Sequence, residues 1–275
     1  MGRIWTPIAS ALREARNDDG GFGPRAGLPS EPEPTALATI ALDDVGGRDW
    51  LGAHQRSDGS VTFDAAAIQN DSATSLAAIA FVGGVQRERA LDHLEATLAR
   101  SVPSTAALPQ DDSVHGWAWT EGTFGWVEPT ARAVLALRLF RPTSPAIQDG
   151  IGMLVDREGA GGGWNYGNRS AFGDDLTPYA QTTAVALVAL QRVDQDLEDR
   201  GLSVLRSLWR RERVGGLSVA LSTAALRLHG DPDAAAAERQ TSELFERTRF
   251  LGDVVTLAWA AIAIGPGLPR LEVAT

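Results

Sequence analysis

An alanine-rich apolar segment recurs six times along the chain and is its dominant pattern. Four copies begin with threonine, at 35–42, 74–81, 130–137 and 183–190, and two looser copies follow at 221–228 and 256–263. These segments are apolar on nearly every side. Helices formed by them must therefore be buried, and alanine allows neighbouring helices to approach closely. We expect six inner helices.

Amphipathic segments with a charged face alternate with these copies. They span 5–16, 48–55, 86–100, 145–158, 195–212 and 232–249. In the third of them, Leu91, Leu94 and Leu98 follow one face at helical spacing. Most of them run into glycine-rich turns such as 161–163, and glycine supplies the backbone conformation that ends a helix. Six outer helices thus alternate with six inner ones.

This alternation predicts an all-α fold. The expected architecture is an α/α toroid, a closed barrel of about six helical hairpins whose apolar inner helices are surrounded by amphipathic outer helices. A single domain of this kind spans residues 1–275. An open solenoid of hairpins has the same periodicity, so the pattern leaves that alternative open.

The amino-acid composition excludes several classes of site and partner. The chain of 275 residues is 44% hydrophobic and 22% charged, which is typical of a globular protein. It has neither cysteine nor lysine, which excludes a thiolate zinc site, a cysteine nucleophile and Schiff-base chemistry. A net charge of −10 disfavours a nucleic-acid partner. The apolar stretch 257–264 is shorter than the roughly 20 residues that span a bilayer, so we expect a cytoplasmic protein without a transmembrane segment.

Two local motifs resemble a known repeat. Gly161-Gly-Gly-Trp-Asn-Tyr-Gly167, followed by the apolar copy at 183–190, is similar to the prenyltransferase/squalene oxidase repeat, and 124–130 resembles the same repeat. The resemblance is best over 20–190. It implies an α/α barrel like those of squalene–hopene cyclases, class II terpene cyclases and protein prenyltransferase β subunits, here as a single-domain bacterial relative.

The acidic motif that the resemblance implies is altered. Class II cyclases protonate an alkene with Asp-x-Asp-Asp-Thr-Ala at the start of an inner helix, and this motif is missing. When the copies are aligned on their Thr-Ala pairs, Glu33 and Glu128 occupy the middle acid position in the first and third copies. Carboxylates therefore stand at equivalent helix starts.

Candidate site residues gather before the third and fourth inner helices. Alkene protonation needs a neutral carboxylic acid in an apolar pocket and aromatic faces that stabilise a carbocation. The candidate catalytic residues are Glu128, which we expect to be the proton donor, Asp111 and His115. The candidate substrate-binding residues are Trp117, Trp119, Phe124, Trp126, Trp164, Tyr166, Tyr179 and Gln181. We expect them to line one concave opening, and His54, His93 and His229 to lie on the surface.

Three functions fit these features. The first is an isoprenoid cyclase of the isomerase or lyase type, which starts cyclisation of a polyprenyl or terpenoid substrate with an acid. The second is a non-catalytic barrel that binds a lipid, peptide or protein. The third is a carbohydrate-active barrel enzyme, because such barrels also hold paired carboxylates and aromatic sugar platforms.

Cofactor and partner expectations follow from the first function. We expect no resident metal or cofactor, although the pairs Asp111/Asp112 and Asp174/Asp175 can recruit Mg²⁺ with a diphosphate substrate. The bound molecule is expected to be a hydrophobic, isoprenoid-like small molecule. Known class II cyclases build their cavity between two barrels, so a homodimer or a partner barrel is expected to complete the pocket.

Overall fold

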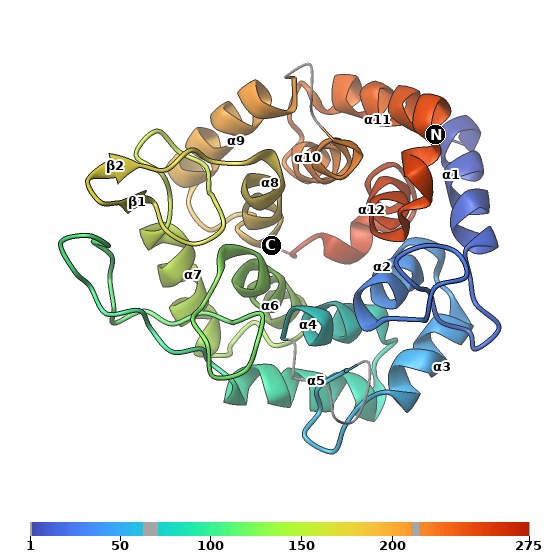
Figure 1. Cartoon of the computed structure of the whole chain (residues 1–275), viewed down its shortest axis with the longest axis horizontal. Helices are drawn as coiled ribbons and strands as arrows, with labels where there is room; N and C mark the ends of the chain where they lie inside the picture. Colours follow the sequence, from blue (N-terminus) through green and yellow to red (C-terminus); the bar gives the residue numbers. More distant parts are fainter. Residues whose placement is uncertain (1, 63–70, 211–214, 275) are drawn as a thin grey trace.

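Two concentric rings of helices form the molecule (Figure 1). The computed structural model describes residues 2–62, 71–210 and 215–274, and twelve α-helices lie within these ranges. The inner ring consists of α2 (Pro32–Leu42), α4 (Asp71–Ala80), α6 (Val127–Phe140), α8 (Ala180–Ala189), α10 (Gly216–Leu228) and α12 (Val254–Ile264). Each inner helix packs against the next, and α12 packs against α2. The predicted closed barrel is therefore confirmed, and the open solenoid is excluded.

The outer ring carries the amphipathic helices. It consists of α1 (Gly2–Glu14), α3 (Val45–Ala53), α5 (Gly84–Ala96), α7 (Ala146–Asp156), α9 (Gln195–Trp209) and α11 (Ala234–Thr248). Five of them pack on the inner helix that precedes them in the chain, whereas α1 packs on α12 and so joins the two ends of the chain. Residues 211 and 212, which the sequence placed at the end of the fifth outer helix, lie outside the described residues.

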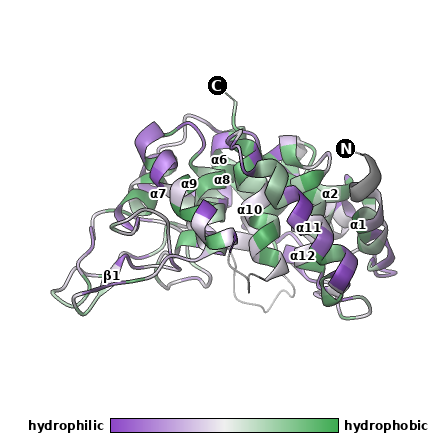
Figure 2. Ribbon diagram, turned by 90° about the horizontal axis from the view of Figure 1, so that it is seen from above, coloured by the Kyte–Doolittle hydropathy of each residue, from purple (hydrophilic) through white to green (hydrophobic). Residues whose placement is uncertain are grey.

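The core lies between and inside the two rings. Ala36, Leu76, Ala133, Val185 and Leu226, one from each of five inner helices, are all buried. Figure 2 shows the hydrophobic colouring concentrated on these inner helices and the hydrophilic colouring on the outer ones. Alanine side chains occupy little space at the centre of a narrow ring, so six helices can approach closely enough to pack against one another.

Buried threonines connect four inner helices to the loops that precede them. In each case the backbone N–H of a fully buried loop residue donates to the threonine Oγ1. The four pairs are Phe22 with Thr35 at 2.9 Å, Val61 with Thr74 at 3.1 Å, Trp117 with Thr130 at 2.9 Å, and Trp164 with Thr183 at 3.0 Å. The threonine that begins each apolar copy thus satisfies a backbone group that has no water to bind.

The two ends of the barrel differ. All inner helices begin at one end, which we call the N-terminal mouth; a short hairpin of β1 (Ser170–Ala171) and β2 (Asp174–Asp175) projects there. At the opposite end, residues 265–274 cross the barrel as a C-terminal strap that contains the 3₁₀ helix η2 (Leu268–Leu271). Figure 2 shows the C-terminus leaving from this face. A second 3₁₀ helix, η1 (Arg249–Gly252), joins α11 to α12.

No helix within residues 2–62, 71–210 and 215–274 is long and apolar enough to cross a bilayer.

Removing one threonine hydroxyl tests how much these loop contacts stabilise the barrel. Thr183→Val leaves the buried N–H of Trp164 without its acceptor, and an unsatisfied buried donor costs about 1–3 kcal/mol. We expect the free energy of unfolding in urea to fall by that amount and Thr183→Ser to retain most of it. Thr39→Val is the matched control, because the buried Thr39 hydroxyl donates to a carbonyl of its own helix. Equal losses for Thr183→Val and Thr39→Val would contradict the prediction.

Candidate functional site

A buried arginine organises the N-terminal mouth. Arg132 lies on α6 with a side chain only 4% exposed. Its Nη2 lies 2.5 Å from Glu128 Oε1 and 2.8 Å from Glu33 Oε1. Its Nη1 donates to Ser72 Oγ at 2.8 Å, and the guanidinium lies 5.9 Å from the centre of the Trp119 ring. These five residues, from α2, α4, α6 and the loop before α6, form what we call the glutamate–arginine cluster.

The repeat explains why two glutamates reach one guanidinium. Glu33 and Glu128 each stand two residues before the threonine of their copy, in the first turn of α2 and α6. A proline follows each of them, which suits the first turn of a helix. The positive end of the helix dipole also favours carboxylates at these positions. Because α4 lies between α2 and α6 in the ring, Arg132 passes over α4 to reach Glu33.

Burial controls the electrostatics of the cluster. Removal from water raises the pKa of Glu128, whose side chain is 21% exposed; the charge of Arg132 lowers this pKa, and the charge of Glu33 raises it further. Burial opposes the charge of Arg132, but the two carboxylates more than offset this and raise its pKa. A carboxyl group with a raised pKa beside a second carboxyl group is the arrangement that acid–base catalysis uses.

Arg132 is not among the residues predicted from the sequence, although the sequence contains a signal for it. At the third position of the four threonine-led copies stand Leu37, Leu76, Arg132 and Val185. A charged residue where the other copies are apolar marks a site that the repeat itself does not require.

Trp117 and Trp164 are core residues. Both side chains are fully buried, and their Nε1 atoms donate to Leu94 O at 2.9 Å and Leu154 O at 2.7 Å. Glycines on the outer helices make room for the two rings: a Cβ on Gly150 would lie 2.8 Å from Trp117, and one on Gly201 would lie 3.0 Å from Trp164. The prediction that these two tryptophans line an opening is wrong, because outer helices cover them.

Asp111 and His115 form hydrogen bonds with nearby loop residues. Asp111 is exposed and accepts hydrogen bonds from Ser113 N at 2.8 Å and Ser113 Oγ at 2.6 Å, which lower its pKa. An acid stabilised in its ionised form is a poor proton donor. His115 Nδ1 lies 3.2 Å from Ala99 O, so this nitrogen donates to the backbone. Neither residue makes a contact with the glutamate–arginine cluster, so the structure does not place them beside Glu128.

Three exposed aromatic side chains lie together at the mouth, and we call them the aromatic platform. They are Trp126, Tyr166 and Tyr179, which are 39%, 48% and 49% exposed. The two tyrosine rings are 5.1 Å apart, and the N–H of Val127 donates to Tyr166 O, which joins the loops. A Cβ on Gly167 would lie 3.2 Å from the Trp126 ring, so this loop passes against the tryptophan.

The other two predicted binding residues lie nearby along the chain. Phe124 is exposed on the loop that leads to Trp126, and Gln181 is half-buried in the first turn of α8. Five cavities of about 430 to 650 Å³ open on the described part of the barrel, and none of the five is lined by the aromatic platform or by the glutamate–arginine cluster. The expected concave opening is not among these five cavities.

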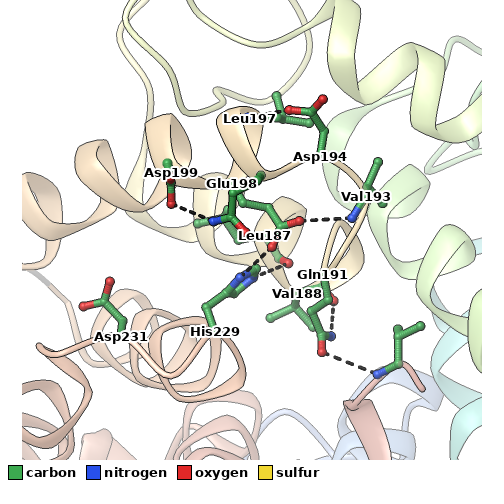
Figure 3. Close-up of polar contacts among 12 residues, drawn as sticks. Leu187, Val188, Gln191, Val193, Asp194, Leu197, Glu198, Asp199, His229 and Asp231 are labelled. Atoms are coloured by element: carbon green, nitrogen blue, oxygen red, sulfur yellow. Dashed lines mark hydrogen bonds and ion pairs between the residues drawn. The ribbon is translucent and has the colours of Figure 1, made fainter. Parts of the chain in front are cut away.

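Two histidines occupy buried positions that the sequence did not indicate. His93 Nε2 lies 3.1 Å from Asp71 Oδ1. Figure 3 shows His229 between Glu198, whose Oε2 is 3.0 Å from Nδ1, and Leu187, whose carbonyl is 3.0 Å from Nε2. These contacts join α4 to α5 and connect α8, α9 and α10, so the expectation that both histidines lie on the surface is wrong.

Metal ligands do not gather in the described ranges. Within residues 2–62, 71–210 and 215–274, no three histidine, aspartate or glutamate side chains come together as a metal site requires.

Comparison with known proteins shows a shared fold. No protein-family model and no curated protein matches the chain. A solved structure of a protein from Actinoplanes is similar over 96% of this chain and 99% of its own, with 14% identity and a TM-score of 0.59. Two glycosidase variants each align over 99% of this chain and 97% of their own, with 10% identity and TM-scores of 0.61 and 0.57.

A fourth structure shares the barrel as part of a much longer chain. A Salmonella alpha-2-macroglobulin variant is similar over 94% of this chain but only 17% of its own, with 14% identity and a TM-score of 0.51. At such low identities, the four comparisons show that single barrels of this size and barrels within larger proteins share this fold.

Substituting Arg132 tests the electrostatic role of the cluster. Arg132→Leu restores the apolar residue of the repeat but leaves Glu33 and Glu128 facing each other. We expect the free energy of unfolding to fall by about 3 kcal/mol at neutral pH, the lower end of the cost of breaking a buried ion pair, because both glutamates are partly open to water.

The pH dependence of the stability loss in Arg132→Leu shows whether the loss comes from charge repulsion or from altered packing. A carboxyl group whose pKa is raised in the folded state stabilises the fold in acid and loses that contribution as pH rises through the raised pKa. The loss in Arg132→Leu should therefore be small near pH 4 and full near pH 7, when measured by urea unfolding. Arg132→Leu combined with Glu128→Gln should recover part of it. A loss that is equal at both pH values would contradict this account.

Proposed function

We propose that this protein is a carbohydrate-active enzyme of the glycosidase type, with the glutamate–arginine cluster as its catalytic centre. One observation carries the proposal. Two glutamates from different inner helices meet at one buried guanidinium nitrogen, and the pKa of one of them, Glu128, is raised.

The paired glutamates match the chemistry of glycoside hydrolysis. One carboxylic acid protonates the leaving oxygen, and a second, ionised carboxylate attacks the sugar or activates water. Glu128 suits the acid role because burial favours its protonated form, and Glu33 then supplies the ionised group. Contacts of 2.5 and 2.8 Å to one nitrogen exclude for the two oxygens the roughly 6.5–9.5 Å separation of inverting enzymes. Arg132 acts as a positioning residue for both.

The aromatic platform fits a sugar ligand. Trp126 stands two residues before Glu128, so the platform and the acid lie at the same end of α6. Tryptophan and tyrosine combine a flat apolar face with a polar edge, which matches a sugar ring with its apolar faces and peripheral hydroxyls. The two glycosidase variants that share the fold over nearly their whole length also support this proposal.

The cluster disfavours the isoprenoid cyclase that the resemblance implies. The guanidinium of Arg132 already lies near the Trp119 ring, so this ring is not free to stabilise a carbocation. Trp117 and Trp164 are covered and cannot stabilise a cation. Descent from the prenyltransferase/squalene oxidase repeat is a separate matter; we propose it for 161–167 and 124–130 as common ancestry, without the cyclase activity.

Glu128→Gln tests the catalytic assignment. General acid catalysis contributes about 10²–10⁴-fold, so we expect hydrolysis of aryl glycosides and oligosaccharides, screened as a panel, to fall by that factor. The melting temperature should stay close to that of the wild type, because glutamine still accepts from Arg132. Glu121→Gln, in the exposed part of the neighbouring loop, is the matched control and should retain full activity.

The same assays decide between the three functions. Hydrolysis that survives in Glu128→Gln would overturn the catalytic assignment. Oligosaccharide binding without turnover would make the barrel a non-catalytic binding protein. Cyclisation of a polyprenyl substrate that depends on Glu128 would favour the cyclase instead.

Tyr179→Ala tests the platform. Loss of one stacking face is expected to weaken binding of the oligosaccharide that the wild type hydrolyses fastest by about 1 kcal/mol, or roughly fivefold in Kd. The measurement is calorimetric titration of that oligosaccharide into Glu128→Gln and into the double variant that also carries Tyr179→Ala. Phe172→Ala is the control, because Phe172 is 83% exposed on the β1–β2 turn and outside the platform. Similar effects of the two substitutions would contradict the prediction.

A further inference from the structure

A cavity of about 490 Å³ lies at the end of the barrel opposite the glutamate–arginine cluster. Its walls come from α1, from the last residues of α10 and α12, and from the C-terminal strap. They include the apolar side chains Trp5, Leu228, Ile264 and Leu268. Its volume falls within the roughly 300–1,000 Å³ of small-molecule sites, and its mostly apolar lining is typical of them.

The walls of this cavity are fixed by contacts. A Cβ on Gly265 would lie 2.2 Å from the Trp5 ring, so only glycine allows Trp5 to pack against the end of α12. Leu271 is buried under the strap, and its carbonyl accepts from Gln191 Nε2 at 2.9 Å. Figure 3 shows the side chain of Gln191 reaching from the end of α8 towards this segment. Arg270 adds an ion pair to Asp43 at 2.5 Å.

Arg227 lies in the wall of the cavity and has hydrogen-bond donors that are not used by the protein. Arg227 Nη1 donates to Ala263 O at 2.5 Å and lies 4.0 Å from Glu238. Nε and Nη2 of Arg227 have no hydrogen-bond partner among the residues that the structure describes. Both atoms are accessible from outside the protein. The other charged residue of the wall, Glu272, pairs with Arg192 at 3.4 Å. The cavity therefore combines an apolar interior with free guanidinium donors.

We propose that this cavity is a second ligand site, separate from the carbohydrate site, and that it takes an amphipathic monocarboxylate. The hydrocarbon chain lies among Trp5, Ile264 and Leu268. The carboxylate accepts hydrogen bonds from Arg227 Nε and Nη2, whose fork geometry matches two carboxylate oxygens.

Octanoate and octanol are the probes for this site. Each is titrated into the 275-residue protein by calorimetry. We expect octanoate to bind and Arg227→Gln to weaken it about tenfold or more, because a charge-assisted, two-point contact is lost. Octanol binds through the chain alone, so its weaker affinity should be the same in Arg227→Gln and wild type, which also shows that the variant is folded. Leu268→Trp fills the cavity and should abolish binding of both.

The outcomes separate this site from the carbohydrate site. Glu128→Gln should bind octanoate like the wild type. Octanoate affinity that is unchanged in Arg227→Gln, or that equals the affinity for octanol, would overturn the assignment of a carboxylate ligand. Binding that survives in Leu268→Trp, or failure of octanoate to bind the wild type, would overturn the site itself.

Discussion

The barrel depends on one hydrogen-bonded contact that is repeated around the ring. A threonine near the start of an inner helix accepts the backbone N–H of a buried loop residue. The hydroxyls of Thr35, Thr130 and Thr183 also lie near the carbonyl of that residue. A loop that enters a dry core leaves backbone groups without water, and such groups must find partners. The threonine supplies one, and each loop is thereby held over its own hairpin.

This contact also fixes where Glu33 and Glu128 lie along the barrel axis. Glu33 and Glu128 precede their threonines by the same two residues, so the ring holds both carboxylates at one rim. Arg132 lies one turn deeper and closes the gap between them. A buried ion pair stabilises a fold weakly, because desolvation of the charges offsets their attraction. An arginine at a position where other copies carry leucine or valine therefore indicates a role in function.

The two ends of the barrel have different chemistry because, among the described residues, the C-terminal strap crosses only one of them. At the N-terminal mouth, charged groups meet an open aromatic surface, and neighbouring loops contact each other through the N–H of Val127. At the opposite end, the strap places leucines and prolines over the ends of α10 and α12 and encloses an apolar cavity beside Arg227. A single ring thus separates a polar site from an apolar one by the length of its inner helices.

The sequence by itself determined the helices, because hydrophobic periodicity is local: the expected 183–190 and 232–249 correspond to α8 and α11 within a few residues. It also determined the position of Glu128 at a helix start. Only the tertiary structure decided that the ring closes, that Arg132 reaches Glu33 across α4, and that Trp164 is covered while Tyr166 is exposed. An aromatic side chain in a glycine-rich loop becomes buried when a distant helix offers space and a carbonyl, and no local pattern records that partner.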